Sequence, residues 1–216
     1  MEVSSFRKFN TIVVLCGSSP GKDNCFIKEA NNLGKVLAKK KQIHLVYGEG
    51  CMGLMGHIAS FVYLGGVKVL GVIPKSLSRH IIGETIGDEL RVLNMQDRMV
   101  NMMNNADAFI TLPGGFGTLE ELFQMVSWAQ LNIHHKPIGI LNVNGFFDGL
   151  LSFLDYAVEK GFISPSARRI IICATTTSEL IDKLQAYIHK QDPTVAHIVW
   201  LEDSSRKCKL DLSLTL

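Results

Sequence analysis

The feature that most constrains the fold is a regular alternation between short apolar runs and longer segments of helical periodicity. The apolar runs lie at residues 11–15, 43–47, 67–73, 107–112, 137–141 and 170–173. Hydrophobic side chains that recur every three or four residues predict helices between them. The predicted helices lie at 26–40, 52–64, 95–105, 118–131, 146–160 and 178–189. Near-continuous apolar strands are typical of a parallel sheet that helices bury on both faces, so the sequence predicts an α/β fold, a Rossmann-like three-layer sandwich.

Length and composition fit one globular domain. The 216 residues are 47% hydrophobic and 19% charged, which is enough apolar material for one sizeable core. We expect this domain to cover residues 1–190, because no linker or internal repeat divides them. The tail, residues 191–216, is polar and irregular apart from an apolar stretch at 198–201, and we expect it to be partly disordered.

Charge and cysteine content exclude several classes of partner. The net charge of +2 argues against nucleic acid or an acidic membrane surface. Five scattered cysteines without a CxxC pair favour reduced thiols over a disulfide framework or a zinc site. No stretch is long and apolar enough for a membrane span or a signal peptide. We therefore expect a soluble protein of the cytoplasm, with the nucleus as the alternative, and no bound metal.

The most informative motif is a glycine-rich stretch between a predicted strand and a predicted helix. It reads Leu112-Pro113-Gly114-Gly115-Phe116-Gly117-Thr118-Leu119-Glu120-Glu121. Such a turn presents backbone N–H groups at the positive end of a helix dipole, where phosphate binds. Glu120 and Glu121 fall in the first turn of the predicted helix. Either they only offset the helix dipole, or one of them serves the ribose of a bound nucleotide, as carboxylates do in glycoside hydrolysis.

Two further glycine loops follow predicted strands, at 16–21 and 48–56. Ligands of open parallel sheets bind at the carboxyl ends of the strands, where these loops belong. The second loop contains Gly48-x-Gly50-x-x-Gly53, which matches the dinucleotide-binding fingerprint. The acid that should end the next strand is missing, and the chain has no GxxxxGK[ST] motif, so both NAD and an ATP-type phosphate loop are disfavoured. Tight turns and close helix packing account for some of these glycines.

Arg98 lies in a methionine-rich segment. On the predicted helix it borders a face formed by Met95, Met99 and Met102. One interpretation is a surface arginine whose stem covers core methionines. The other is an arginine at the rim of the ligand crevice, where it neutralises phosphate or assists a leaving base.

Taken together, these residues resemble the signature of the Lonely Guy family, the cytokinin riboside 5′-monophosphate phosphoribohydrolases formerly labelled possible lysine decarboxylases. The signature combines PGGFGTLEE at 113–121 with Arg98 upstream and WAQL at 128–131. The resemblance runs from about residue 9 to residue 187 and leaves the tail uncovered. Its other motifs are CGSS at 16–19, LVYG at 45–48, GLMG at 53–56, VLGVIPKSL at 69–77, GETIG at 83–87, ADAFI at 106–110, KPIGILNV at 136–143 and EKGFISPSARRII at 159–171.

The resemblance implies a specific reaction and a set of site residues. The reaction cleaves the N-glycosidic bond of an N6-modified adenosine monophosphate, which releases the cytokinin base and ribose 5-phosphate without an organic cofactor. Arg98 and Glu121 would be catalytic. The expected substrate contacts are Gly114, Gly115, Phe116, Gly117, Thr118, Leu119, Glu120, Ser18, His80, Met99 and Ser127.

The resemblance also implies a homodimer. The predicted helix 118–131 is apolar around much of its circumference, with Phe123, Val126, Trp128 and Ala129. That pattern fits a helix partly buried by a second subunit.

Four positions depart from the family pattern. Glu49 stands in a loop usually written YGGG, and Met99 replaces the lysine that usually follows the arginine. His80 falls near a position that often carries glutamate, and Ser127 replaces a threonine. One charge lost and one unfavourable charge gained would weaken ligand binding by about 1–3 kcal/mol. The alternative function is therefore a weakened or inactive paralogue that binds the nucleotide monophosphate. A lysine decarboxylase is disfavoured, because no lysine stands out as an anchor for pyridoxal phosphate.

Overall fold

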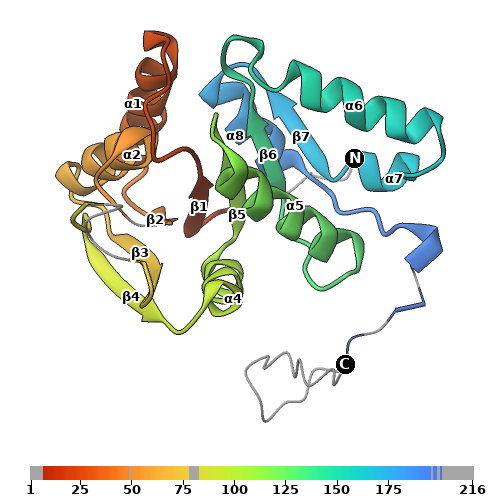
Figure 1. The fold of residues 1–216 in the computed structure, drawn as a ribbon, viewed down its shortest axis with the longest axis horizontal. Coiled ribbons are helices and arrows are strands. Elements are labelled where there is room, and N and C mark those ends of the chain that lie inside the picture. Colours follow the sequence, from red (N-terminus) through yellow and green to blue (C-terminus); the bar gives the residue numbers. More distant parts are fainter. Residues whose placement is uncertain (1–6, 49, 78–82, 196, 199, 201–216) are drawn as a thin grey trace, which may run out of the picture.

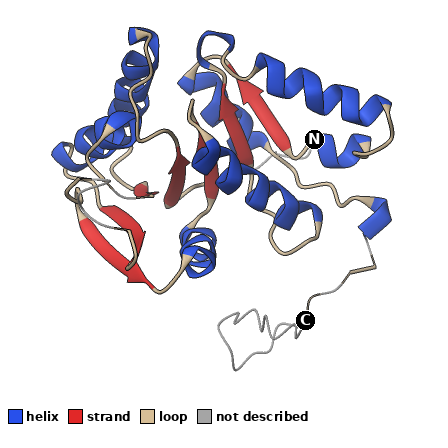
Figure 2. Ribbon diagram, in the orientation of Figure 1, coloured by secondary structure: helices blue, strands red, loops and turns tan. Residues whose placement is uncertain are grey.

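The computed structural model describes residues 7–48, 50–77, 83–195, 197–198 and 200. In this part of the chain, seven strands form one parallel sheet in the order β4-β3-β2-β1-β5-β6-β7. The strands are β1 (Thr11–Leu15), β2 (His44–Tyr47), β3 (Val69–Pro74), β4 (Asp88–Val92), β5 (Ala108–Thr111), β6 (Ile138–Leu141) and β7 (Ile171–Ala174). Figure 2 shows the strands lying between helices.

Helices cover both faces of the sheet, as the sequence predicts. They are α1 (Asn24–Lys39), α2 (Gly53–Leu64), α4 (Met95–Asn105), α5 (Phe116–Gln130), α6 (Asp148–Glu159), α7 (Pro165–Arg168) and α8 (Thr177–Ala186). Buried side chains of α1, α2 and α8 form one core with one face of the sheet. Those of α4, α5, α6 and α7 form a second core with the other face. In Figure 1, α1 and α2 lie near β1 to β3, and α6 lies near β6 and β7. The three-layer α/β sandwich is therefore confirmed.

All six predicted strands and all six predicted helices are present, with ends that shift by at most three residues. The prediction missed β4 and α7. β4 is one of the two edge strands of the sheet, with the sequence DELRV, and only its last residue is buried. An edge strand half covered by solvent has no continuous apolar run to reveal it. The four-residue α7 does carry a short signal, because the Ser164 hydroxyl accepts a hydrogen bond from the Ala167 N–H and Pro165 follows the cap.

The first residues of the expected tail contact the domain. A 3-10 turn, η2 (Pro193–Val195), lies beside the loop after α5, where the Asn132 side-chain amide donates to the Val195 carbonyl at 3.2 Å. The Trp200 indole N–H donates to the Leu131 carbonyl at 2.7 Å. Residues 201–216 lie outside the described residues, so the boundary expected at residue 190 stays a prediction.

His134 fixes the segment between α5 and β6. Its ring packs on Phe109 of β5, with 5.6 Å between the ring centroids, and the residue is buried. The Nε2–H donates to the Met125 carbonyl at 3.0 Å, and Nδ1 accepts the Lys136 N–H at 3.2 Å. Burial, followed by the positive charge of Lys136, lowers the pKa of His134 to about 4. The imidazole is therefore neutral in the folded protein at neutral pH.

We expect His134 to make the fold sensitive to acid. Its folded-state pKa lies below the unfolded value of 6.5, so its contribution is present above pH 6.5 and is lost as the pH falls towards 4. The free energy of unfolding should fall by up to about 3 kcal/mol in that window because of this group. Urea unfolding at pH 7 and pH 5 measures the loss. His134→Gln should reduce the pH dependence, whereas His57→Gln, at an exposed histidine, should not; identical slopes for His134→Gln and the parent protein would contradict the assignment.

Candidate active site

The three glycine loops meet at one point on the carboxyl edge of the sheet. β1 lies between β2 and β5: the strands β2 to β4 extend the sheet on one side of β1, and the chain then crosses over to add β5 to β7 on the other side. The Gly17 N–H, after β1, donates to the Pro113 carbonyl, after β5, at 3.0 Å. The Gly17 carbonyl accepts the Leu54 N–H, after β2, at 3.1 Å. These two hydrogen bonds confirm that the loops meet at the carboxyl ends of the strands, as the sequence predicts. Ligands of open α/β sheets bind at such a switch point.

Two of these glycines are required by close packing. A Cβ on Gly114 would lie 2.1 Å from the Thr118 hydroxyl oxygen, at the start of α5. A Cβ on Gly53 would lie 2.2 Å from the Ser18 carbonyl carbon, and the φ of Gly53 is +57°. For these positions, close helix packing and a left-handed backbone explain the glycine without a dinucleotide.

The helix after the glycine turn begins earlier than predicted. α5 starts at Phe116, with the extended Gly115 as its N-cap, so the prediction of a start at Thr118 is wrong. The expectation that Glu120 and Glu121 lie in the first turn is therefore also wrong, since that turn holds no acid. The helix includes Gly117, although glycine is a poor helix former. In the second turn a carboxylate is less useful for offsetting the dipole, because the effect is confined to the first turn.

Arg98 and Glu121 form a buried ion pair at this edge of the sheet. Nη2 of Arg98, on α4, lies 2.5 Å from Oε1 of Glu121, on α5. The two residues are only 7% and 6% exposed. Arg98 also donates through Nε to the Val72 carbonyl at 3.1 Å and through Nη2 to the Gly48 carbonyl at 3.4 Å. Arg98 is thus a fixed internal cation, and the interpretation as a surface arginine is wrong.

Burial sets the protonation behaviour of the site. It raises the pKa of Glu121 above the ordinary glutamate value; the Arg98 guanidinium opposes that change and Glu120 adds to it. Burial, with the Glu121 charge beside it, raises the pKa of the Cys16 thiol, so Cys16 stays protonated. A titratable acid with a perturbed pKa and a specific charge partner is a candidate for chemistry.

The methionine face of α4 differs from the prediction. Met99 and Met102 are buried in the core, but Met95 is 41% exposed. Met95 is the first helical residue after the N-cap Asn94, whose side chain accepts the Asp97 N–H. The helix therefore starts at the edge of the core, so Met95, which the periodicity places on the same helix face as Met99 and Met102, is not buried with them.

The expected substrate contacts differ in how far they are exposed to solvent. Thr118 is buried and Gly114 and Leu119 are half-buried at the glycine turn. The exposed ones are Ser18, Gly115, Phe116, Gly117, Glu120 and Ser127. The structure brings Ser18 close to the glycine-rich start of α5. Gly17, the residue before Ser18, lies next to Gly114 and donates its N–H to the Pro113 carbonyl, and the Ser18 carbonyl lies next to Gly53.

Other expected contacts lie away from this surface or outside the described residues. Met99 is 1% exposed and packs inside the core, and Ser127 lies towards the C-terminal end of α5. His80 and Glu49 lie outside the described residues. All of these substrate contacts stay predictions.

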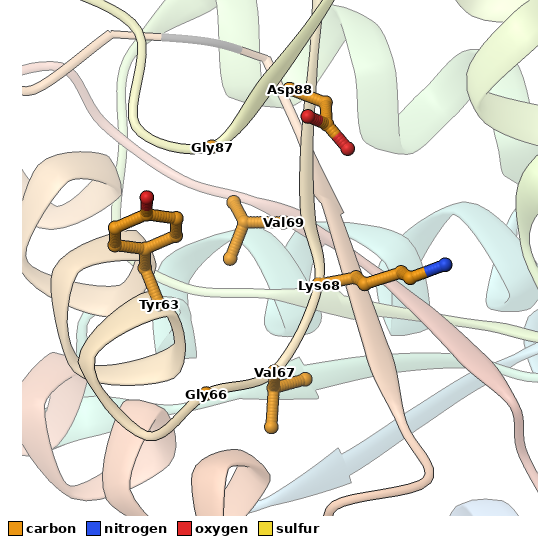
Figure 3. A pocket seen from close by; sticks show the side chains of 7 residues that line it. All are labelled: Tyr63, Gly66, Val67, Lys68, Val69, Gly87 and Asp88. Carbon is orange, nitrogen blue, oxygen red and sulfur yellow. The ribbon is translucent and has the colours of Figure 1, made fainter.

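A shallow hollow of about 440 Å³ lies at the opposite edge of the sheet (Figure 3). It lies between the C-terminal end of α2 and the first residues of β3 and β4. Its lining residues are Tyr63, Gly66, Val67, Lys68, Val69, Gly87 and Asp88. The hollow is distant in the fold from Arg98 and Glu121, because strands begin there and end at the switch point. Among the described residues, no three His, Cys, Asp or Glu side chains are grouped so that they could hold a metal ion.

The buried ion pair should dominate the response to mutation at this site. Replacing Glu121 with Leu leaves Arg98 buried without a counter-charge, which costs about 3–5 kcal/mol of unfolding free energy. The double variant Arg98→Met with Glu121→Leu should recover part of that loss, because no buried charge remains. Urea unfolding measures both.

The exposed pair of Arg168 and Asp155, 2.7 Å apart, is the matched control. Asp155→Asn should cost less than about 1 kcal/mol, since surface ion pairs contribute little. A Glu121→Leu variant no less stable than Asp155→Asn would show that the pair is not buried in solution.

Comparison with known proteins gives a consistent result. The family described as "Possible lysine decarboxylase" matches residues 55–184. A probable cytokinin riboside 5′-monophosphate phosphoribohydrolase of Oryza sativa subsp. japonica is 50% identical over 203 residues, which covers 94% of this chain and 81% of the relative. A cytokinin riboside 5′-monophosphate phosphoribohydrolase of Arabidopsis thaliana is 50% identical over 196 residues, which covers 90% of each chain.

Solved structures share the fold at low identity. The molybdenum cofactor binding protein of Rippkaea orientalis has a TM-score of 0.59 and 20% identity, over 81% of this chain and 94% of that one. The Moco carrier protein of Chlamydomonas reinhardtii has a TM-score of 0.56 and 15% identity, over 79% and 92%. At these identities the likeness concerns the fold alone.

Proposed function

Because the chain belongs to the family of cytokinin riboside 5′-monophosphate phosphoribohydrolases, we propose that it hydrolyses the N-glycosidic bond of these nucleotides. The products are the free cytokinin base and ribose 5-phosphate. Identity of about 50% over most of the chain supports the reaction. The buried pair of Arg98 and Glu121 beside a glycine turn is the observation that carries it, since it puts a carboxylate next to a phosphate-binding helix start.

The 114–118 turn would hold the 5′-phosphate. Gly115, Phe116 and Gly117 are exposed at the N-terminal end of α5, so their N–H groups and the positive end of the helix dipole are open to an anion. Thr118 is buried against Gly114 and shapes the turn. This role needs neither a metal nor an organic cofactor.

Glu121 would act on the ribose. The bond from C1′ to the base breaks with its electron pair on the base, and positive charge develops on the ribose. The water that bonds to C1′ releases one proton, and the departing base takes up one proton, so water supplies both new groups. A carboxylate at that place stabilises the charge or orients the water whose oxygen bonds to C1′. Arg98 contacts Oε1 of Glu121, so Oε2 would be the oxygen that acts on the substrate. Arg98 would keep the carboxylate ionised and in place.

The assay that tests this function compares three compounds. Isopentenyladenosine monophosphate should yield free base faster than AMP or isopentenyladenosine, because only the first offers both the N6 group and the phosphate. Chromatography of the released base, with ribose 5-phosphate as the second product, gives the rate. Glu121→Gln keeps the shape of the side chain and should lower kcat by a factor of about 10² or more. A near-parental rate in a folded Glu121→Gln protein would contradict the proposed role.

A binding paralogue is the second candidate. The buried Met99 supplies no positive charge where the family pattern has lysine. Protein that is stabilised by the monophosphate in thermal unfolding, yet releases no base, would favour this candidate over the enzyme.

We also propose a homodimer. Phe116 is 94% exposed, and Phe123, Val126 and Trp128 on the same helix are half-buried. A second copy that covers this helix would remove their apolar surface from water. Light scattering should give twice the mass of 23.9 kDa; the monomer mass at micromolar concentration would contradict it.

Two observations bear on the proposed location of the protein. None of the described helices combines the length and apolarity that a membrane crossing requires. The described cysteines, Cys16, Cys25, Cys51 and Cys173, are free thiols. We propose the cytoplasm, with the nucleus as the alternative, which a fluorescent fusion would distinguish.

A further inference from the structure

Gly48 lies against both members of the buried ion pair. It follows β2 directly, and its carbonyl accepts the Arg98 Nη2–H at 3.4 Å. A Cβ on Gly48 would lie 2.1 Å from that same Nη2 and 3.6 Å from Oε1 of Glu121. No side chain other than hydrogen fits there while the guanidinium keeps its place.

The backbone of Gly48 does not itself require glycine. The described glycines with positive φ are Gly21, Gly50, Gly53, Gly66, Gly83, Gly87, Gly145 and Gly161, and Gly48 is not among them. Alanine is therefore compatible with the backbone conformation. The conflict is confined to the far end of the Arg98 side chain.

We propose that Gly48 is a positioning residue for the hydrolysis: the absence of a side chain at position 48, together with its carbonyl, seats the Arg98 guanidinium against Glu121. The Val72 carbonyl holds the Nε end of the same group. The first glycine of Gly48-x-Gly50-x-x-Gly53 thus makes room for an arginine, not for the pyrophosphate of a dinucleotide. This inference rests on the proposed function for its kinetic consequences but not for its geometry.

Displacing Arg98 would change the charge around Glu121. Among the described residues, the charged and titratable groups that act on Glu121 are Arg98 from α4, Glu120 from α5 and the protonated Cys16 after β1. Of these groups, Arg98 favours the ionised carboxylate. Without its contact, burial and Glu120 remain, and both raise the pKa of Glu121 further. As the pH falls, activity that needs the ionised carboxylate would then be lost at a higher pH than in the parent protein.

The test is Gly48→Ala, with Gly149→Ala as the matched control. A Cβ on Gly149, on α6, meets no atom within 4 Å, so the control makes the same chemical change at an open position. Gly48→Ala should fold, because a flexible side-chain end can move aside. Its kcat should fall roughly tenfold to hundredfold, as expected for a misplaced catalytic group, with little change in KM, since the phosphate-binding turn is untouched. The acidic limb of its pH–rate profile should move to higher pH, and Gly149→Ala should leave both unchanged.

A double variant separates positioning from general damage. Arg98→Lys should lower kcat in the parent protein but should cost little more in Gly48→Ala, because Arg98 is already displaced there. Additive losses would overturn the proposal. So would a Gly48→Ala protein with parental kcat and an unmoved acidic limb.

A titration without substrate keeps the result independent of the proposed function. Carboxyl NMR of ¹³C-labelled glutamate, with Glu121 assigned by its loss in Glu121→Gln, should show a higher pKa for Glu121 in Gly48→Ala. If the parent protein releases no base but this shift is found, the proposed function fails and the seating of Arg98 stands. If base is released and neither the shift nor the kinetic change is found, the proposal for Gly48 fails alone.

Discussion

The buried ion pair between Arg98 and Glu121 is the interaction on which the site depends. Two charges removed from water carry a large desolvation cost, which only close contact and further hydrogen bonds offset. The 2.5 Å contact and the carbonyls of Val72 and Gly48 supply them. These four positions come from β3, α4, α5 and the loop after β2. The pair therefore exists only when the parallel sheet is assembled around β1.

The fold by itself does not explain the proposed chemistry, because unrelated functions share it. The molybdenum cofactor proteins share the fold at TM-scores of 0.56–0.59, so the sheet does not decide the reaction. In folds of this kind the switch point brings loop backbone N–H groups to the carboxyl ends of the strands, where ligands bind. The proposed reaction would depend on which side chains lie beside them. Of the neighbouring acids on α5, Glu121 is buried with Arg98, whereas Glu120 is exposed. Helix geometry separates consecutive residues by about 100°, which assigns them to different surroundings.

Much of the fold was predictable, because periodicity is a local property of the chain. The buried strands from β1 to β7 were visible as apolar runs, and only the edge strand β4, with its exposed acid and arginine, was missed. The start of α5 lies two residues before the predicted one, and the first turn includes Gly117 although glycine is a poor helix former. The exposure of Met95 was not predictable, because periodicity shows which residues share a helix face but not how far the core extends along that face.

By itself, the sequence determined the alternation of strands and helices, the presence of a glycine-rich connection between β5 and α5 and the family to which the chain belongs, because each depends on residues close together or on motifs in order. The tertiary structure decided the burial of Arg98, its contact with Glu121 and the reason for glycine at position 48. Those properties depend on which groups from distant segments occupy the same volume. Local sequence patterns do not encode the distance between groups from distant segments. The free energy of a buried charge depends on that distance.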